Sequence, residues 1–210
     1  MLRYPVCLRP LRIAVLLFSL MAMVPESGAT TVLAPEFPKL VSGSDCIVRA
    51  VVKNVTSVKK SRGAGRSAKI FTEVELTVTE VIAGNPPANL TLELLGGKVG
   101  EQELTVEGMP QFHVGDEDIL FVSGNGKNIS PLYGMMHGRY PILKDATGRR
   151  YVARSDGEPL RTTAQISTPM AEGTADTRSA QATASALTPE DFIAQIKAAP
   201  QLTTPAPRAN

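Results

Sequence analysis

The amino-acid sequence predicts a mainly-β fold, a small barrel or sandwich of six to seven strands, and two patterns support this prediction. The clearer pattern lies in residues 70–97, where Val74, Leu76 and Val78 alternate with polar side chains. An alternation of period two is typical of a strand with one buried face. The second pattern is the spacing of turn signals, which recur about every ten residues between Cys46 and Arg154 with no convincing helix among them.

Residues 1–29 are expected to be a secretory signal peptide that is absent from the mature protein. Three arginines precede the apolar run of residues 13–24, and the small residues Ser27, Gly28 and Ala29 supply a cleavage point. The alternative is an uncleaved anchor, for which the run is short, because a membrane-spanning helix needs about twenty residues. The sequence therefore predicts an exported protein, periplasmic or extracellular, with no stable membrane anchor after cleavage.

The charge and cysteine content limit the partners and sites that the mature chain could have. The full chain has 22 basic and 20 acidic residues, and removal of the leader takes away three arginines and one glutamate, which leaves 19 of each. A nucleic-acid partner is not expected, because it would require a basic field. Cys46 is the only cysteine after the leader, so it cannot form an intramolecular disulfide or a Cys-x-x-Cys metal site. We expect it to be buried as a small hydrophobe.

The β domain is predicted to span residues 30–160 and to begin with a short helix near residues 37–41. Residues 46–58 have apolar side chains on both parities near their start, which indicates burial on both faces or a bulge. Pro86 and Pro87 end the strand that begins near Thr72, since proline cannot donate to a strand ladder. The other expected strands are residues 90–94, a weak strand at 103–106, a core strand at 119–122, and a hairpin of residues 139–143 and 149–154.

The C-terminal part of the chain is expected to contain one helix between two disordered segments. Residues 161–186 are rich in Ala, Thr and Ser, and this composition predicts a disordered linker. A helix is predicted at residues 187–199, with Thr188 as N-cap, Pro189 in the first turn and Leu187 placed to pack against Phe192. Because so short a helix is marginal alone, it should dock on the barrel or on a partner. Residues 200–210 are expected to be a disordered tail.

Few residues in the sequence are suited to catalysis. The two histidines, His113 and His137, lack metal-ligand spacing, and no Gly-x-Ser-x-Gly, P-loop or dinucleotide motif is present. Asp116, Glu117 and Asp118 place three carboxylates in one turn, which suits a cation or simply a sharp turn before a core strand. We therefore predict no catalytic, metal or cofactor site. The alternative is a small metal-dependent hydrolase or metal-handling protein that uses these two histidines and the acidic turn.

Two segments are candidates for contact with a protein partner. Residues 59–69 hold five basic residues and no acid, which suits an anionic contact or a solvated hairpin tip. Residues 133–138 combine methionines with a histidine, which suits an adaptable contact surface, the filling of a core gap or a soft copper site. The candidate contact residues are Lys59, Lys60, Arg62 and Arg66 in the first segment, and Tyr133, Met135, Met136 and His137 in the second.

The order of these features resembles a widespread group of secreted bacterial proteins of mostly unassigned function, over roughly residues 40–152. The resemblance is carried by residues 44–48, 72–76 and 78–84, then by Gly96 and Gly97, and by residues 114–117 before 119–121. The chain is similar in the same sense to the OB-like barrel of netrin modules and tissue inhibitors of metalloproteinases. The resemblance implies a small OB-like barrel, closed or partly open, of five to seven strands with a short N-terminal helix.

The resemblance also implies a protein partner, because some members of the bacterial group occur beside genes for secreted matrixin-type zinc proteases. The inhibitory mechanism cannot be carried over: those inhibitors begin at a cysteine whose amino group ligates the protease zinc, and they carry several disulfides. This mature chain would start near Thr30 and has no disulfide. The sequence therefore predicts a non-catalytic secreted or periplasmic binding module that contacts a protein, with a secreted matrixin-type metalloprotease as the candidate partner.

Overall fold

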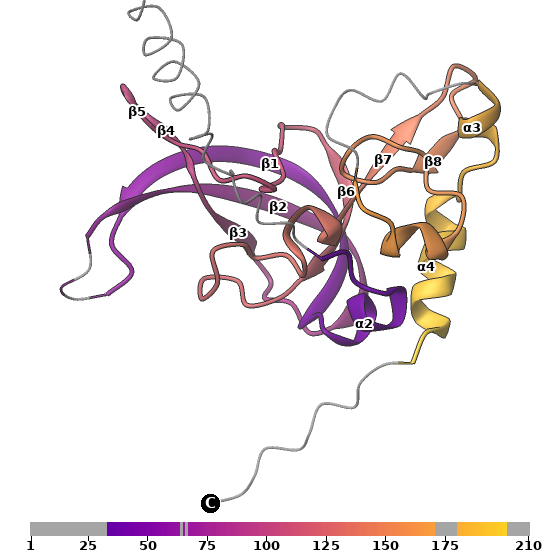
Figure 1. The fold of residues 1–210 in the computed structure, drawn as a ribbon, viewed down its shortest axis with the longest axis horizontal. Coiled ribbons are helices and arrows are strands. Elements are labelled where there is room, and N and C mark those ends of the chain that lie inside the picture. The colour runs from indigo at the N-terminus through magenta and orange to yellow at the C-terminus, as the bar shows by residue number, and fades with distance from the viewer. Residues whose placement is uncertain (1–32, 64, 66, 171–179, 201–210) are drawn as a thin grey trace, which may run out of the picture. The chain divides into compact units, whose positions relative to one another are not determined.

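The computed structural model describes residues 33–63, 65, 67–170 and 180–200, and these form a mainly antiparallel β structure. Eight strands make one six-stranded sheet, in the order β3-β2-β1-β6-β7-β8, and a two-stranded sheet of β4 and β5 (Figure 1). The mainly-β prediction is confirmed, and the strands of the described residues do not close into a barrel. None of the helices described is long and apolar enough to cross a membrane. The expected signal peptide, the tail beyond residue 200 and Arg66 lie outside the described residues.

The predicted helices and strands all occur in the expected order, and β4, η2, η3 and α3 are additions that the sequence did not predict. The elements are α2 (Phe37–Ser42), β1 (Cys46–Lys60), β2 (Lys69–Gly84), β3 (Leu90–Leu95), β4 (Gly97–Val99), β5 (Gln102–Leu104), β6 (Glu117–Val122), η2 (Met135–Gly138), β7 (Arg139–Lys144), β8 (Arg150–Val152), η3 (Thr163–Ser167), α3 (Ala180–Ala184) and α4 (Pro189–Ala198).

Strands β1 and β2 form one long curved ribbon that organises the rest of the chain (Figure 1). Their pairing runs from Cys46 opposite Gly84 to Lys60 opposite Lys69. Three register shifts interrupt it, all in the part of β1 between Ile47 and Asn54. Because a bulge adds an unpaired residue and increases the local twist, these shifts account for the bend of the ribbon.

The central part of the six-stranded sheet is buried on both faces. Neighbouring residues on a strand point to opposite faces, so Ile47 and Val48 of β1 enter different cores. Phe121 and Leu120 of β6 are divided in the same way. One core also takes in helices α2 and α4, whereas the other lies on the concave face of β1, β2 and β3. Burial on both faces explains the continuous apolar run in β6.

The disordered linker expected at residues 161–186 is wrong for the part of this segment that the structure describes. Residues 163–167 form η3, and Ile166 is buried in the core that holds α2 and α4. Thr162 and Gln165 form a capping box at its start, and the Arg154 guanidinium donates to the Thr168 carbonyl at 2.7 Å. One buried isoleucine and local capping bonds therefore order a stretch whose composition predicts disorder. Residues 180–184 form α3, and residues 171–179 lie outside the described part.

Helix α4 packs on the sheet of its own chain. Of the two alternatives that the sequence left open, docking on the β domain or on a partner, the structure has the first. The Thr188 hydroxyl accepts a hydrogen bond from the Asp191 amide at 3.1 Å, as expected for an N-cap. Phe192, Ile193 and Ile196 are buried. The Phe192 ring lies 5.1 Å from that of Tyr140 in β7, centroid to centroid.

The segment after β6 runs back along the outer edge of β3. The amide of Leu95 donates to the Ile129 carbonyl at 2.8 Å, and the amide of Glu93 donates to the Asn125 side chain at 3.1 Å. At its far end the segment returns to β6, where Val122 and Leu132 form an isolated bridge. Residues 124–132 therefore contact both β3 and β6, which lie on opposite sides of the β1–β2 ribbon.

Candidate functional site

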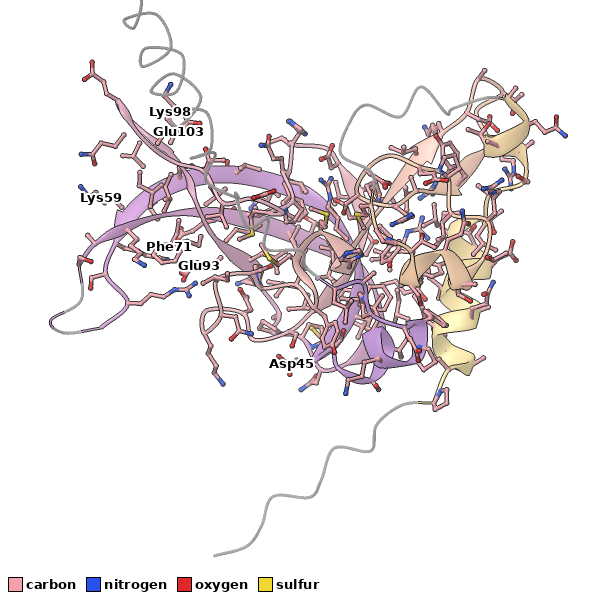
Figure 2. The ribbon with its side chains drawn as sticks, viewed as in Figure 1. Asp45, Lys59, Phe71, Glu93, Lys98 and Glu103 are labelled. Carbon is pink, nitrogen blue, oxygen red and sulfur yellow. The ribbon has the colours of Figure 1, made fainter. Side chains whose placement is uncertain are left out.

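The free end of the β1–β2 ribbon presents a charged face opposite the concave core. Thr72 and Val74 point toward the concave side, so their neighbours Phe71 and Glu73 point to the other face. The register places Glu73 directly opposite Glu93 of β3. Two like charges in this position repel each other, so the pair requires a cation. Figure 2 shows Phe71 and Glu93 at this end of the ribbon, near Lys59.

Lys60 and Arg62 supply the cations. The Lys60 ammonium contacts both Glu73 and Glu93, and the Arg62 guanidinium contacts Glu93. The guanidinium also lies over the Phe71 ring, 4.3 Å from its centroid, and donates to the Asn128 carbonyl at 2.6 Å. Burial acts to raise the pKa of Glu93, but the hydrogen bonds and charges of Lys60 and Arg62 outweigh it and hold that pKa below its ordinary value. Lys60 and Arg62 are thus fixed in place by strand β3 and are not a freely solvated hairpin tip.

A cavity of about 380 Å³ opens beside these ion pairs, and we call it the basic cleft. Phe71, Leu95 and Ile129 give it an apolar floor, and Ile129 remains 54% exposed. Among the described residues, no carboxylate lines the cleft, and neither Lys69 nor Lys127 makes an ion pair. The lining residues are Lys60, Arg62, Ser67, Lys69, Phe71, Leu95, Lys127 and Ile129. Such a site suits a negatively charged group that also carries an apolar portion.

Of the basic residues expected to contact a partner, Lys60 and Arg62 line this cleft. Lys59 points to the β4–β5 hairpin instead, where its ammonium donates to the Gln102 side chain at 2.9 Å. Lys127 was not among the predicted contact residues, and it comes from the distant segment after β6. Only the contact of that segment with β3 brings it to the cleft.

The second candidate contact segment lies at the opposite end of β1. The Tyr133 amide donates to the Phe121 carbonyl at 2.9 Å, and Phe121 pairs with Ile47 near the start of β1. Met135 and Met136 are half-buried in η2, and His137 is only 3% exposed. The structure therefore does not bring Tyr133–His137 together with the basic residues, and His137 is not accessible to a partner.

The acidic turn is engaged by arginines. The Arg139 guanidinium donates at 2.8 Å to both Asp116 and Asp118. Glu117 accepts from Arg49 at 2.8 Å and from Arg150 at 2.7 Å. These bonds join β6 to β1, β7 and β8, and they give the three carboxylates a structural role.

The two histidines do not combine with the acidic turn into a metal site among the described residues. The His113 ring is 77% exposed, and its Nδ1 lies 3.5 Å from the Asp116 carboxylate. Among the residues that the structure describes, no three His, Cys, Asp or Glu side chains form a group that could hold a metal ion.

Cys46 is buried, as expected for a small hydrophobe at the start of β1. Burial, together with the nearby Asp45 carboxylate, raises the pKa of its thiol to about 11. The thiol is therefore protonated at neutral pH and unsuited to nucleophilic chemistry.

No protein-family model and no curated protein matches the chain.

Proposed function

We propose that the protein is a non-catalytic, exported binding module that contacts an acidic surface of a protein partner through the basic cleft. The observation that carries this proposal is the set of cations held around an apolar floor by three separate parts of the chain. Glu73 and Glu93 offset Lys60 and Arg62, so Lys69 and Lys127 supply the charge that remains for a partner. A charged rim around an apolar centre is the usual arrangement of a protein contact.

The architecture proposed for this module is a partly open OB-like barrel. Two facts support it: the order β3-β2-β1-β6, and the hydrogen bonds of residues 124–132 to both β3 and β6. In this interpretation, residues 124–132 take the place of a closing strand. The basic cleft would then lie at the seam between this segment and β3.

The candidate partner is a secreted matrixin-type metalloprotease, which the resemblance to secreted bacterial proteins suggests. A metal-dependent function of the acidic turn is not proposed, because guanidinium groups already occupy its three carboxylates. The module itself needs no cofactor for binding of this kind.

The test is affinity capture from the native secreted fraction, with the mature protein as bait and mass spectrometry to identify what binds. We expect Lys69→Glu combined with Lys127→Glu to weaken capture about tenfold or more, and the loss to be greater at low salt. The matched control combines Lys39→Glu with Lys144→Glu, which makes the same charge change at two exposed sites outside the cleft. Capture that survives the cleft substitutions, or is lost equally with the control, would contradict the proposal.

A further inference from the structure

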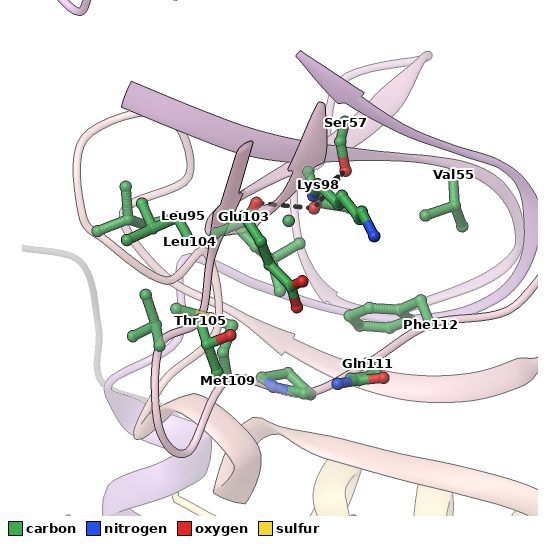
Figure 3. Close-up of a pocket in the computed structure, with 16 residues that line it drawn as sticks. Val55, Ser57, Leu95, Lys98, Glu103, Leu104, Thr105, Met109, Gln111 and Phe112 are labelled. Carbon is green, nitrogen blue, oxygen red and sulfur yellow. Dashed lines mark hydrogen bonds between the residues drawn. The ribbon is translucent and has the colours of Figure 1, made fainter. Parts of the chain in front are cut away.

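A second cavity, which we call the concave pocket, lies on the opposite face of the ribbon from the charged side chains (Figure 3). Its volume is about 270 Å³. The wall on one side is the concave face of β1, β2 and β3, and the wall on the other is formed by the β4–β5 hairpin and residues 105–112. It is the open end of the concave core, since Val55 and Met109 pack against that core and also line the pocket.

A register shift in β1 builds the floor of this pocket. Before the shift, Val48, Ala50 and Val52 point to the concave core; after it, the residues on that side are Val55 and Ser57. The shift between Val52 and Asn54 therefore changes the parity of the strand. Val55 is thereby placed opposite Val74, and Ser57 opposite Thr72.

Two glycines allow the β4–β5 hairpin to pack closely over the floor of the pocket. Gly96 and Gly97 have φ angles of 116° and 123°, which L side chains rarely adopt. A Cβ on Gly97 would lie 2.4 Å from the hydroxyls of both Ser57 and Thr72. The Thr72 hydroxyl donates to the Gly96 carbonyl at 2.8 Å, and the Lys98 amide donates to the Ser57 hydroxyl at 3.4 Å. The hydroxyl pair thus holds the hairpin over the pocket without filling it.

The lining combines an apolar wall with a few polar side chains and one charge of each sign at the hairpin. The apolar wall is formed by Val55, Leu94, Leu104, Val106, Met109 and Phe112. Figure 3 shows the side chains of Lys98 and Glu103, one from each strand of the hairpin, extending toward Phe112. The Arg139 guanidinium lies 4.3 Å from the centroid of the Phe112 ring and helps to fix that wall. Because Lys98 and Glu103 carry opposite charges, the pocket has no net charge, and its apolar wall favours an apolar group over an ion.

We propose that an extended segment of the protein partner pairs with β5 and inserts one large apolar side chain into the concave pocket. This inference rests on the proposed function, because it assumes a protein partner. The pocket is smaller than the about 300–1,000 Å³ that is usual for small-molecule pockets. Its volume of about 270 Å³ therefore suits a single side chain. The sheet order supports strand addition: β5 pairs only with β4 among the described strands, so its outer edge has no strand beside it.

The probe is a displayed library of linear seven-residue peptides, selected on the mature protein and remade as synthetic peptides. We expect the selected peptides to share one large apolar residue. Val106→Trp, which fills the pocket from a half-buried lining position, should weaken their binding at least about tenfold. Glu107→Trp is the matched control. The side chain of Glu107, next to Val106 in the chain, is exposed and does not line the pocket, so binding should stay within about twofold. Unchanged melting temperatures would confirm that both variants fold.

Main-chain pairing is tested with the same peptides, N-methylated at one amide at a time. β5 has three residues, and only alternate amides of an added strand face it, so methylation should abolish binding at alternate positions of the paired part of the peptide and leave it unchanged at the positions between and outside them. Peptides that tolerate Val106→Trp, or methylation effects without this alternation, would overturn the inference. The inference would also be wrong if the library yields no binding peptide, even if the apolar dye 1-anilinonaphthalene-8-sulfonate binds the pocket. If capture of the natural partner fails with the Lys69 and Lys127 substitutions but survives Val106→Trp, the proposed function stands and only this inference is wrong.

Discussion

At the level of single residues, Glu93 links the parts of the basic cleft. Its side chain is only 17% exposed and contacts both Lys60 and Arg62. Without this carboxylate, two cations would lie beside each other against an aromatic ring, with only Glu73 to neutralise them. Glu93 therefore both stabilises the end of the ribbon and sets how much positive charge the cleft presents.

Glu93→Gln is expected to lower the free energy of unfolding by about 1–3 kcal/mol at pH 7, because bonds to two charged donors are lost. Since Lys60 and Arg62 hold the pKa of Glu93 below its ordinary 4.5, its contribution is fully present above that pH and disappears as the pH falls through the lowered value. The difference between wild type and variant should therefore shrink below about pH 4. Urea unfolding from pH 7 to pH 3 measures it, with Glu75→Gln, 47% exposed, as control. A difference that stays constant across this range would mean that ionisation of Glu93 does not contribute to stability.

At the level of elements, the sequence predicted most clearly the strands in which apolar and polar residues alternate, because one face of such a strand is buried. Residues 72–79 alternate, and β2 follows the alternation: Val74 and Leu76 are buried, and Thr77 is exposed. In β1, apolar side chains on both parities indicated burial on both faces or a bulge, but they did not locate the three register shifts, because the position of a bulge depends on how the partner strand is paired. The β4 strand was missed for a related reason: its three residues, each of them a glycine or next to one, are too few to show a period.

The candidate site was predictable only in part, for similar physical reasons. The basic residues of the hairpin stand out in the sequence, but their pairing with Glu73 and Glu93 depends on the register between β2 and β3. Lys127 reaches the cleft through a segment with no repeating pattern. Conversely, the histidine of residues 133–138 stood out as unusual, yet its side chain is buried.

The register of β2 can be tested by a pair of neighbouring substitutions. Leu76→Ala should lower the free energy of unfolding by about 2–5 kcal/mol, since Leu76 is buried in the concave core and its loss leaves a cavity. Glu75→Ala should change it by about 0.5 kcal/mol or less, because Glu75 is 47% exposed and its Lys53 partner lies 3.8 Å away on the surface. Chemical denaturation of the two variants measures both values. Similar losses for both would show that the side chains face the other way.

At the level of the whole molecule, the core that holds α2 and α4 joins segments from both ends of the described chain. Phe37 from α2 and Phe192 from α4 lie 6.1 Å apart, centroid to centroid, above Phe121 of β6. Lys197 of α4 also reaches Glu80 of β2 at 2.8 Å. The helices thus cover one face of the sheet, and the concave pocket lies on the other. This separation implies that loss of α4 would weaken the fold without touching the proposed contact surfaces.

Phe192→Ala should therefore lower the free energy of unfolding by about 3–5 kcal/mol, since the ring is fully buried among three other aromatic rings. For a domain of this size, such a loss corresponds to a fall in melting temperature of roughly 10 °C. Deletion of residues 187–210 should lower the melting temperature at least as much. Lys197→Ala, on the exposed side of the same helix, should have little effect. Thermal unfolding followed by circular dichroism measures all three variants, and peptide binding by the folded Phe192→Ala protein should be retained. An unchanged melting temperature would mean that α4 contributes nothing to the domain and is instead free to bind a partner.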